Sequence, residues 1–430
     1  MSVELIICLV LFGSLLLGIP IFASLGIASV AAIMVSGISF SIIPLDLLKM
    51  GSMFPLLAIP AFILAGVLME KADMAGQIIE TIQIIFGRIT GGLGIITIVA
   101  SMFFASLIGS GPATAAAMGA ILIPAMHKAG YGKAYTAGVC AVGGTMGILI
   151  PPSNPMIVYG VIGNVSVTSL FIAGIMPGIM LGLMLIGTAY IIARKKGYKG
   201  TGEPFNMKHF LKTAYKNKWS LFAPIVIIGG IYGGIFTPVE ASVVAVLYAF
   251  LVGFFVTKKL RNKKLLWETL VFTVETSGMV LIVVAVTQLF ARILVMQQVP
   301  QRLAEWSVSV SDNPKIILLM IVGFLMILGM FIEELATMAA VTPILVPLAN
   351  QVGIDTVHLG VVMVMTNEVA MLTPPLGVVL FVLMKMSNLS LGQVARAVLP
   401  FLLTLILATL IVVFFEDIAL FLPRLMGYSG

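Results

Sequence analysis

Long apolar stretches separated by short polar segments run along almost the whole chain. The 430 residues are 60% hydrophobic and 10% charged, with a mean hydropathy of +1.17. Soluble domains carry about 25% charged residues, so the pattern predicts a membrane protein. A helix needs about 20 apolar residues to cross a bilayer, which leaves room for roughly ten to twelve crossings plus re-entrant pieces. We therefore expect an all-α, polytopic membrane fold.

Two basic clusters interrupt the apolar pattern, at residues 194–218 and 258–264. The stretch between them, Leu221 to Val256, is broken at Thr237-Pro238 and predicts two crossings, so both clusters lie on one side. Lys and Arg gather in cytoplasmic loops. This bias accounts for the net charge of +7 without a nucleic acid or another anionic partner. Glu240 follows the break, and we expect it to cap the next helix.

The two halves of the chain share a register of prolines. A shift of 223 positions aligns GPATAAAMGAILIP with ELATMAAVTPILVP and superposes four proline pairs. Residues 111–180 hold six prolines and residues 334–403 hold five, so chance would give about 0.4 coincidences. The chain is therefore predicted to be a duplication, with repeats at 1–219 and 220–430. The superposed prolines are Pro124, Pro151, Pro152 and Pro177 with Pro347, Pro374, Pro375 and Pro400.

Charge distribution predicts that the repeats have inverted topology. If the first half starts outside and the second inside, 19 of the 24 basic residues lie in the cytoplasm. The first repeat then ends in the basic connector 194–218, and both termini are periplasmic. A parallel arrangement needs a further crossing, for which no apolar run remains. The N-terminal stretch from Glu4 to about Val35 lacks signal-peptide features and is expected to remain as membrane helices.

Each repeat is predicted to hold a re-entrant hairpin, at about 92–126 and 315–349. Helix ends inside a membrane are tolerated only where they line a cavity. The first tip, 108–112, has glycines and a proline for the turn; the alternative is a small-residue packing face. The second tip carries Glu333 and Glu334 in an apolar run. Intramembrane carboxylates usually have a function, the alternative being a loop at the membrane surface.

Each repeat also holds a helix that we expect to be broken, at about 135–160 and 359–384. Pro151-Pro152 and Pro374-Pro375 each remove two N–H donors and force the helix to unwind. The freed carbonyls form a hard-oxygen cage for an alkali cation, and the N-termini of the half-helices favour an anion. Simple kinks are the alternative. The side chains expected to complete the cages are Thr145, Thr366, Thr373 and Asn367.

Other function classes fit the sequence poorly. An intramembrane enzyme needs a nucleophile–base pair or a metal cluster, but the three His residues match no metal-ligand spacing and there is no HExxH motif. We therefore expect no enzymatic activity. A purely structural or assembly subunit would not require duplicated broken helices.

Four motifs resemble the large membrane (M) subunit of tripartite ATP-independent periplasmic (TRAP) transporters. They are GGTMGILIPPSNPMIVYG, LTPPLGVVLFV, GGIYGGIFTPVEAS and ATAAAMGAILIPAM. The resemblance, which covers nearly the whole chain, implies an elevator-type transporter with scaffold and transport domains in the bacterial inner membrane. It implies sodium-driven symport, with two or more Na⁺, of an organic acid anion delivered by a periplasmic substrate-binding protein. A small four-helix membrane subunit is the other implied partner.

Among subfamilies, overall likeness favours sialic acid (N-acetylneuraminate) systems. Four-carbon dicarboxylates or another carboxylate stay open, as does a stand-alone sodium–dicarboxylate or citrate-type carrier. Where the family usually has Asp in the second tip, this chain has Glu333. The resemblance implies substrate contacts at Ser110, Ser153, Asn154, Glu333 and Gly377. It implies Na⁺ ligands at Gly109, Gly143, Gly144, Thr145, Gly147, Pro151, Thr337, Thr366, Asn367, Met371 and Thr373.

Overall fold

Helices make up all the regular structure in the part of the chain that the computed structural model describes, which is residues 3–50, 53–200, 205–374 and 377–428. Six helices are long and apolar enough to cross a membrane, or seven if the bent pair α15–α16 counts as one. This is fewer than the ten to twelve crossings that composition allows. Much of the remaining apolar sequence forms shorter helices of 10–17 residues, which include the second half of the first broken helix and both halves of the second.

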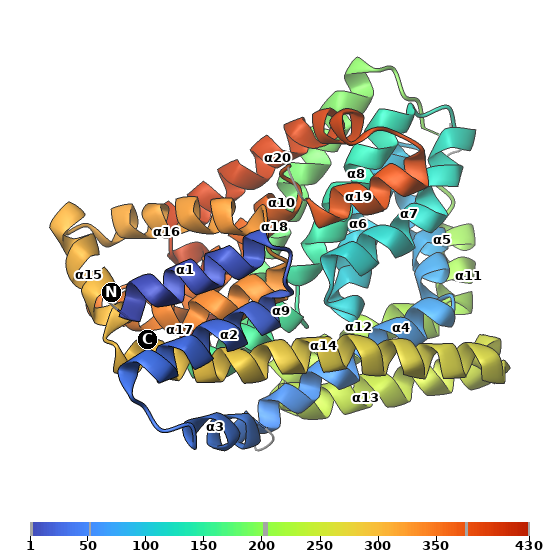
Figure 1. Cartoon of the computed structure of the whole chain (residues 1–430). Coiled ribbons are helices and arrows are strands. Elements are labelled where there is room, and N and C mark those ends of the chain that lie inside the picture. Colours follow the sequence, from blue (N-terminus) through green and yellow to red (C-terminus); the bar gives the residue numbers. More distant parts are fainter. Residues whose placement is uncertain (1–2, 51–52, 201–204, 375–376, 429–430) are drawn as a thin grey trace.

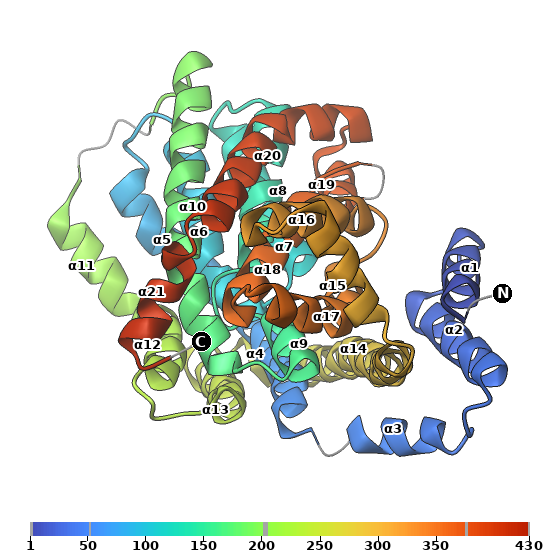
Figure 2. The ribbon, with the colours of Figure 1, turned by 90° about the vertical axis from the view of Figure 1, so that its left-hand side faces the viewer.

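A layer of long helices forms one side of the molecule, where α4, α13 and α14 pack together (Figure 1). The preceding helix α2 packs on α14, α1 packs on α2, and the three share a separate small apolar core (Figure 2). The elements of this part are α1 (Val3–Leu16), α2 (Ile21–Ser36), α3 (Ile42–Met50), the 3₁₀ turn Phe54–Leu57, α4 (Ala58–Lys71), α5 (Met74–Phe86), α11 (Met207–Lys216), α12 (Lys218–Tyr232), α13 (Pro238–Leu251), the π turn Val252–Val256, the 3₁₀ turn Lys259–Arg261, α14 (Lys263–Met296) and α15 (Val299–Val310).

Two polar pairings fix this layer. Thr237 and Glu240 form a capping box at the start of α13, in which each side chain accepts a hydrogen bond from the other residue's backbone N–H. The expected cap is thereby confirmed. Arg292 of α14 forms an ion pair of 2.7 Å with the buried carboxylate of Asp46 on α3. That pair ties α3 to α14.

The hairpins and broken helices occupy the middle of the molecule, flanked by α10 and α20 (Figures 1 and 2). Most of the large apolar core lies here, because these helices are buried on several faces. The elements of the first set are α6 (Gly92–Ile108), α7 (Gly111–Lys128), α8 (Lys133–Thr145), the 3₁₀ turn Met146–Ile148, α9 (Asn154–Gly163) and α10 (Val167–Lys195). Those of the second are α16 (Pro314–Gly329), α17 (Glu334–Val352), α18 (Thr356–Met371), α19 (Val378–Ser387) and α20 (Leu391–Phe414), followed by α21 (Asp417–Leu425).

The helix boundaries of the two sets follow the offset found in the sequence. Subtracting 223 from the first residues of α16, α17, α18, α19 and α20 gives 91, 111, 133, 155 and 168. The first residues of α6, α7, α8, α9 and α10 are 92, 111, 133, 154 and 167. Five consecutive helices therefore begin within one residue of their mates, so the duplication is visible in the chain's secondary structure as well as in its prolines.

Candidate functional site

Both hairpin tips and both broken helices converge at Gly111, the first residue of α7. Its backbone N–H donates a hydrogen bond to the carboxyl group of Glu334, the first residue of α17. A Cβ atom at Gly111 would lie 2.9 Å from the methyl carbon of Met371 and 3.8 Å from the carbonyl oxygen of Gly144. The four segments that sequence reasoning selected therefore meet at one place.

The first tip needs glycine because the backbone turns sharply beside another segment. Gly109 has φ +63°, a left-handed conformation that side chains disfavour. A Cβ there would lie 3.2 Å from the amide nitrogen of Asn154 and 3.3 Å from the carbonyl oxygen of Pro152. Ser110 is the N-cap residue of α7, but its hydroxyl makes no capping hydrogen bond. The predicted contact residues Gly109, Ser110 and Asn154 thus lie around the junction of the tip with α9.

The first break lies between the 3₁₀ turn Met146–Ile148 and α9, where the Pro151-Pro152 peptide bond is cis. Ser153 begins α9: its hydroxyl donates to the carbonyl of Ile148 and accepts from the N–H of Met156. Asn154 is buried, and its Oδ1 has no partner among the described residues. Ser153 is therefore engaged in capping, while the Asn154 amide oxygen remains free for a ligand.

The predicted first cation cage gains a residue that sequence reasoning missed. A Cβ at Gly143 would lie 2.6 Å from the hydroxyl oxygen of Ser101 on α6, which is buried without a partner in the described part of the chain. Thr145 donates its hydroxyl proton to the Val142 carbonyl at 3.0 Å, so its oxygen lone pairs stay open to a cation. Gly147 lies buried in the 3₁₀ turn. Within an apolar run, a serine such as Ser101 carries no sequence signal of its own.

The second broken helix has the same hydroxyl arrangement. Thr366 and Thr373 donate to the carbonyls of Val362 and Val369, each at 2.7 Å, which again leaves oxygen lone pairs free. Gly377 has φ +41° and precedes α19, and a Cβ there would lie 2.8 Å from a methyl carbon of Leu380. Pro375, the second proline of the predicted pair, lies outside the described residues.

The two carboxylates of the second tip lie in different surroundings. Glu333 is exposed, and its Oε2 accepts hydrogen bonds from the N–H groups of Leu335 and Ala336 at 3.1 and 3.2 Å, so it caps α17. Thr337 is buried, and its hydroxyl donates to the Ile332 carbonyl at 3.4 Å. Glu334 is only 2% exposed and points to the first tip. The buried carboxylate of the tip is therefore Glu334, and a substrate contact at Glu333 stays a prediction.

A third carboxylate, Glu368, was missing from the expected ligands. It lies on α18 with 0% exposure, and the charge of Glu334 repels it. Neither of its carboxylate oxygens has a hydrogen-bond partner among the described residues. The neighbouring Asn367, an expected Na⁺ ligand, is 1% exposed and its amide is likewise without a partner there. The signal for Glu368 was present in the sequence, because a carboxylate stands inside an apolar run.

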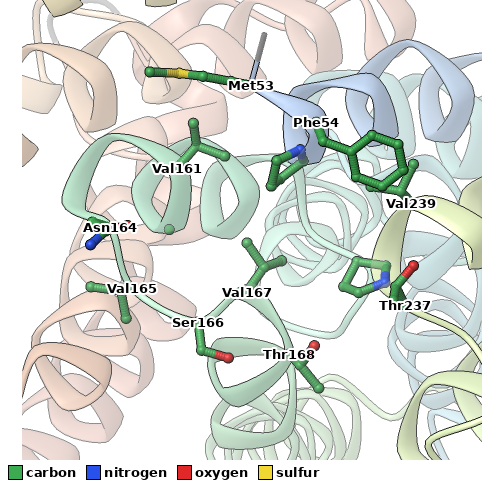
Figure 3. A pocket seen from close by; sticks show the side chains of 13 residues that line it. Met53, Phe54, Val161, Asn164, Val165, Ser166, Val167, Thr168, Thr237 and Val239 are labelled. Atoms are coloured by element: carbon green, nitrogen blue, oxygen red, sulfur yellow. The ribbon is translucent and has the colours of Figure 1, made fainter.

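Two cavities lie outside this junction. One, of about 590 Å³, is lined by the turn between α9 and α10, the start of α13 and the segment Met53–Pro55 (Figure 3). The other, of about 460 Å³, lies between α14 and α17 and contains Asp46 and Arg292. None of the predicted substrate or cation residues lines either of these two cavities.

Curated relatives of this chain are transporter permeases with different substrates in their names. An isethionate TRAP transporter permease of Oleidesulfovibrio alaskensis is 38% identical over 94% of the chain, which spans 64% of that relative's length. A C4-dicarboxylate TRAP large permease of Pseudomonas aeruginosa is 38% identical over 94% of the chain and 95% of its own length. A sialic acid TRAP large permease of Vibrio cholerae is 38% identical over 87% of the chain and 88% of its own length.

The fold itself also occurs among solved transporters. The Alcanivorax borkumensis YdaH transporter superposes with a TM-score of 0.66 over 85% of this chain and 86% of its own, at 13% identity. That likeness concerns the fold alone. The family model for the DctM component of the tripartite ATP-independent periplasmic transporter matches residues 8–418. With a match over nearly the whole length, and with 38% identity to large permeases, the chain belongs to the DctM (large permease) family of TRAP transporters.

Proposed function

We propose that this chain is the transport subunit of a binding-protein-dependent TRAP system for sodium-coupled uptake of an organic acid anion. The protein would lie in the bacterial inner membrane, with both termini in the periplasm. Its partners are a small four-helix membrane subunit and a periplasmic substrate-binding protein, as implied by membership of the family. The work is secondary active transport and not catalysis.

One observation carries the proposal, namely the convergence of two hairpin tips and two broken helices at Gly111. Residues 111 and 334 are equivalent under the 223 offset, and they contact each other directly. Contact between equivalent positions is expected close to an axis that relates two repeats, which supports a symmetric arrangement of the two halves. Broken helices at such an axis present carbonyls to cations and N–H groups to an anion in the same small volume.

Cation binding at the broken helices would fix the position of the two hairpin tips. The oxygen atoms of Thr145, Thr366 and Thr373 keep lone pairs free, and the unwound carbonyls lie beside them. Na⁺ bound there would hold the tips against the broken helices and complete an anion site that includes Ser110 and Asn154. Hairpins and broken helices would then move together, as the transport domain of an elevator, against the layer of α4, α13 and α14. Coupling requires only that Na⁺ and substrate favour the same state.

Sialic acid is the anion that we propose first, on the overall likeness of the sequence. Four-carbon dicarboxylates are the second candidate, since the Pseudomonas aeruginosa relative named for them is matched with equal identity over almost its full length. Isethionate, a sulfonate, is the third. Stabilisation of the purified protein against heat by N-acetylneuraminate, succinate or isethionate, in the presence of Na⁺, would order these candidates.

Reconstitution tests the function itself. Liposomes containing this chain and its small subunit, supplied with the binding protein outside, should accumulate the anion only under an inward Na⁺ gradient. One charge that crosses a potential of 100 mV supplies about 2.3 kcal/mol, so an electrogenic Na⁺ excess also predicts dependence on voltage. Undiminished uptake without Na⁺ would overturn the sodium mechanism. Uptake without the binding protein would instead indicate a stand-alone sodium–dicarboxylate or citrate-type carrier.

A further inference from the structure

Helix α11 lies at the outer edge of the molecule, in the connector between the two repeats. Figure 2 views α14 along its axis but shows α11 lengthwise, so α11 runs across the direction of the long helices. Figure 1 places α11 at the end of the molecule where α14 begins. Because α14 is long and apolar enough to cross a membrane, α11 would lie along the plane of that membrane, near one of its surfaces.

Polar contacts fix α11 on α5 in one orientation. The side-chain amide of Asn217, which directly follows α11, donates to the carbonyl of Gln77 at 3.1 Å and to a carboxylate oxygen of Glu80 at 2.9 Å. Lys216 forms an ion pair of 3.0 Å with the same Glu80. One face of α11, with the buried Thr213, thus packs on the protein. The directions of its other faces follow from this anchoring.

Apolar side chains form a stripe along an exposed face of α11. Met207, Leu211 and Tyr215 recur every fourth residue, which places them on one side of the helix, and each is more than half exposed. The stripe continues into α12 with Phe222 and Ile225, which are also more than half exposed. An apolar stripe that lies along a membrane surface inserts into the boundary between headgroups and acyl chains. The stripe therefore favours contact with lipid.

A stripe of lysines runs beside the apolar one. Lys208, Lys212 and Lys216 each follow an apolar-stripe residue by one position, which turns their side chains about 100° around the helix. All three are exposed, and Lys208 and Lys212 form no salt bridge with a described residue. Helix α11 itself contains no Asp or Glu. Its exposed surface therefore presents uncompensated positive charge next to apolar side chains.

The corner between α11 and α12 adds groups that are typical of a membrane interface. The ammonium of Lys218 lies 4.1 Å from the ring centroid of Tyr215 and 5.4 Å from that of Trp219. Near the start of α14, at the same end of the molecule, Trp267 is exposed. Tyr and Trp are enriched at the level of the lipid headgroups. These aromatic residues therefore place α11 at headgroup depth.

We propose that α11 is a binding surface for anionic phospholipids, whose acyl chains contact the stripe Met207–Leu211–Tyr215 and whose phosphate groups bind Lys208 and Lys212. Charge complementarity selects this occupant, because lysines at a membrane surface attract anionic lipids and zwitterionic lipids carry no net charge. Bound lipid would hold the connector between the repeats at the membrane surface. The competing occupant is the small membrane subunit, which would shield the stripe from lipid.

A fluorescent label on the apolar stripe tests the proposal. Bimane attached to Leu211→Cys reports contact with lipids that carry bromine in their acyl chains; the background is Cys8→Ser, because Cys8 is exposed and Cys140 is buried. The labelled chain, purified with its small subunit, is placed in vesicles of equal phosphatidylglycerol and phosphatidylcholine, one of which is brominated. Phosphatidylglycerol should be preferred about 25-fold, since each of two lysines contributes about fivefold. Addition of 0.5 M NaCl should weaken the preference by screening.

Matched variants isolate the two lysines. Lys208→Gln combined with Lys212→Gln should reduce the preference to about equal quenching by the two lipids. Lys128→Gln combined with Lys133→Gln removes the same charge from exposed positions on either side of the α7–α8 turn, and it should retain the preference. The label at Met207→Cys, on the same stripe, serves if Leu211→Cys does not fold.

Each contrary outcome has a distinct meaning. A label that neither lipid quenches would overturn the proposal, because the small subunit then covers the stripe. Equal quenching by both lipids with the native lysines present would overturn the selection of anionic headgroups. A preference that survives the loss of Lys208 and Lys212, or that falls as far in the control variant, would overturn their assignment. These results are independent of sodium coupling, because the label measures only lipid contact.

Discussion

The first hairpin tip and the second occupy the same place in the two sequence repeats but carry different side chains. In the first, α7 begins with Ser110 as N-cap and Gly111 as its first residue; in the second, α17 begins with Glu333 and Glu334. The broken helices differ in the same direction. The pairs related by the offset of 223 are Ser110 and Glu333, Gly111 and Glu334, Gly144 and Asn367, and Thr145 and Glu368.

This difference teaches that the duplicated halves have kept their backbone geometry while dividing the chemistry. The first half offers backbone N–H groups, carbonyls and hydroxyls, with glycines that let α7 approach α8 closely. The second half offers three carboxylates and an amide at the equivalent positions. Where equivalent residues meet, at Gly111 and Glu334, a donor from one half faces an acceptor from the other. Two glycines could not form that bond, because neither would have a carboxylate to accept it.

The largest expected difference in the free energy of unfolding lies between substitutions at the equivalent positions Gly144 and Asn367. A Cβ at Gly144 would lie 2.4 Å from the Cβ and 2.8 Å from the Cα of Ala115, so Gly144→Ala must push α7 away from α8. We expect a loss of about 3 kcal/mol in the free energy of unfolding. Asn367→Ala removes a buried amide without a described partner and should cost about 1 kcal/mol or less in buffer without Na⁺. Denaturation curves of both variants measure the two losses in the free energy of unfolding. Equal losses would contradict the division of chemistry between the two halves.

The caps of α7 and α17 should show a smaller difference. Glu333→Ala removes a side chain that accepts from two N–H groups, so it should cost about 1 kcal/mol. Ser110→Ala removes a hydroxyl that makes no capping bond, so it should change the free energy of unfolding by less than about 0.5 kcal/mol. Glu333→Asp is the control because Asp caps well. Equal losses at Ser110 and Glu333 would show that capping does not distinguish the tips.

Sequence alone could predict where the helices break because the physical cause is local. Proline lacks an N–H and excludes the preceding residue from the helical region wherever it stands, so the register of Pro151 and Pro374 fixed the positions of both breaks. The hairpin helices α6 and α7 likewise span 92–128, within two residues of the range of about 92–126 expected from glycine and apolar pattern. Membrane class and family were accessible for the same reason, since both depend on composition and on contiguous motifs.

The orientation of individual carboxylates could not be predicted from the local sequence. Glu333 and Glu334 are adjacent, and which of them points inward depends on the residue at which α17 begins, since one residue turns a helical side chain by about 100°. The sequence named Glu333 as a substrate contact, which stays a prediction, but it gave no sign that Glu334 would be the carboxylate at the junction. The position of Glu368 at the junction depends on tertiary packing even more, because it arises from the approach of α17 to α18. Ser101 gained its place beside Gly143 in the same manner.

The smallest expected effect concerns two threonines one turn into the returning helices. Thr114 donates to the Ser110 carbonyl at 2.8 Å, and its repeat mate Thr337 donates to the Ile332 carbonyl at 3.4 Å. The shorter bond is the stronger, so Thr114→Val should cost about 0.5 kcal/mol more than Thr337→Val in buffer without Na⁺. Saturating Na⁺ should reverse the order if Thr337 is a cation ligand, because only Thr337→Val then loses an oxygen that the ion binds. Unfolding curves with and without NaCl measure this crossover, and an unchanged order would remove Thr337 from the proposed cation ligands.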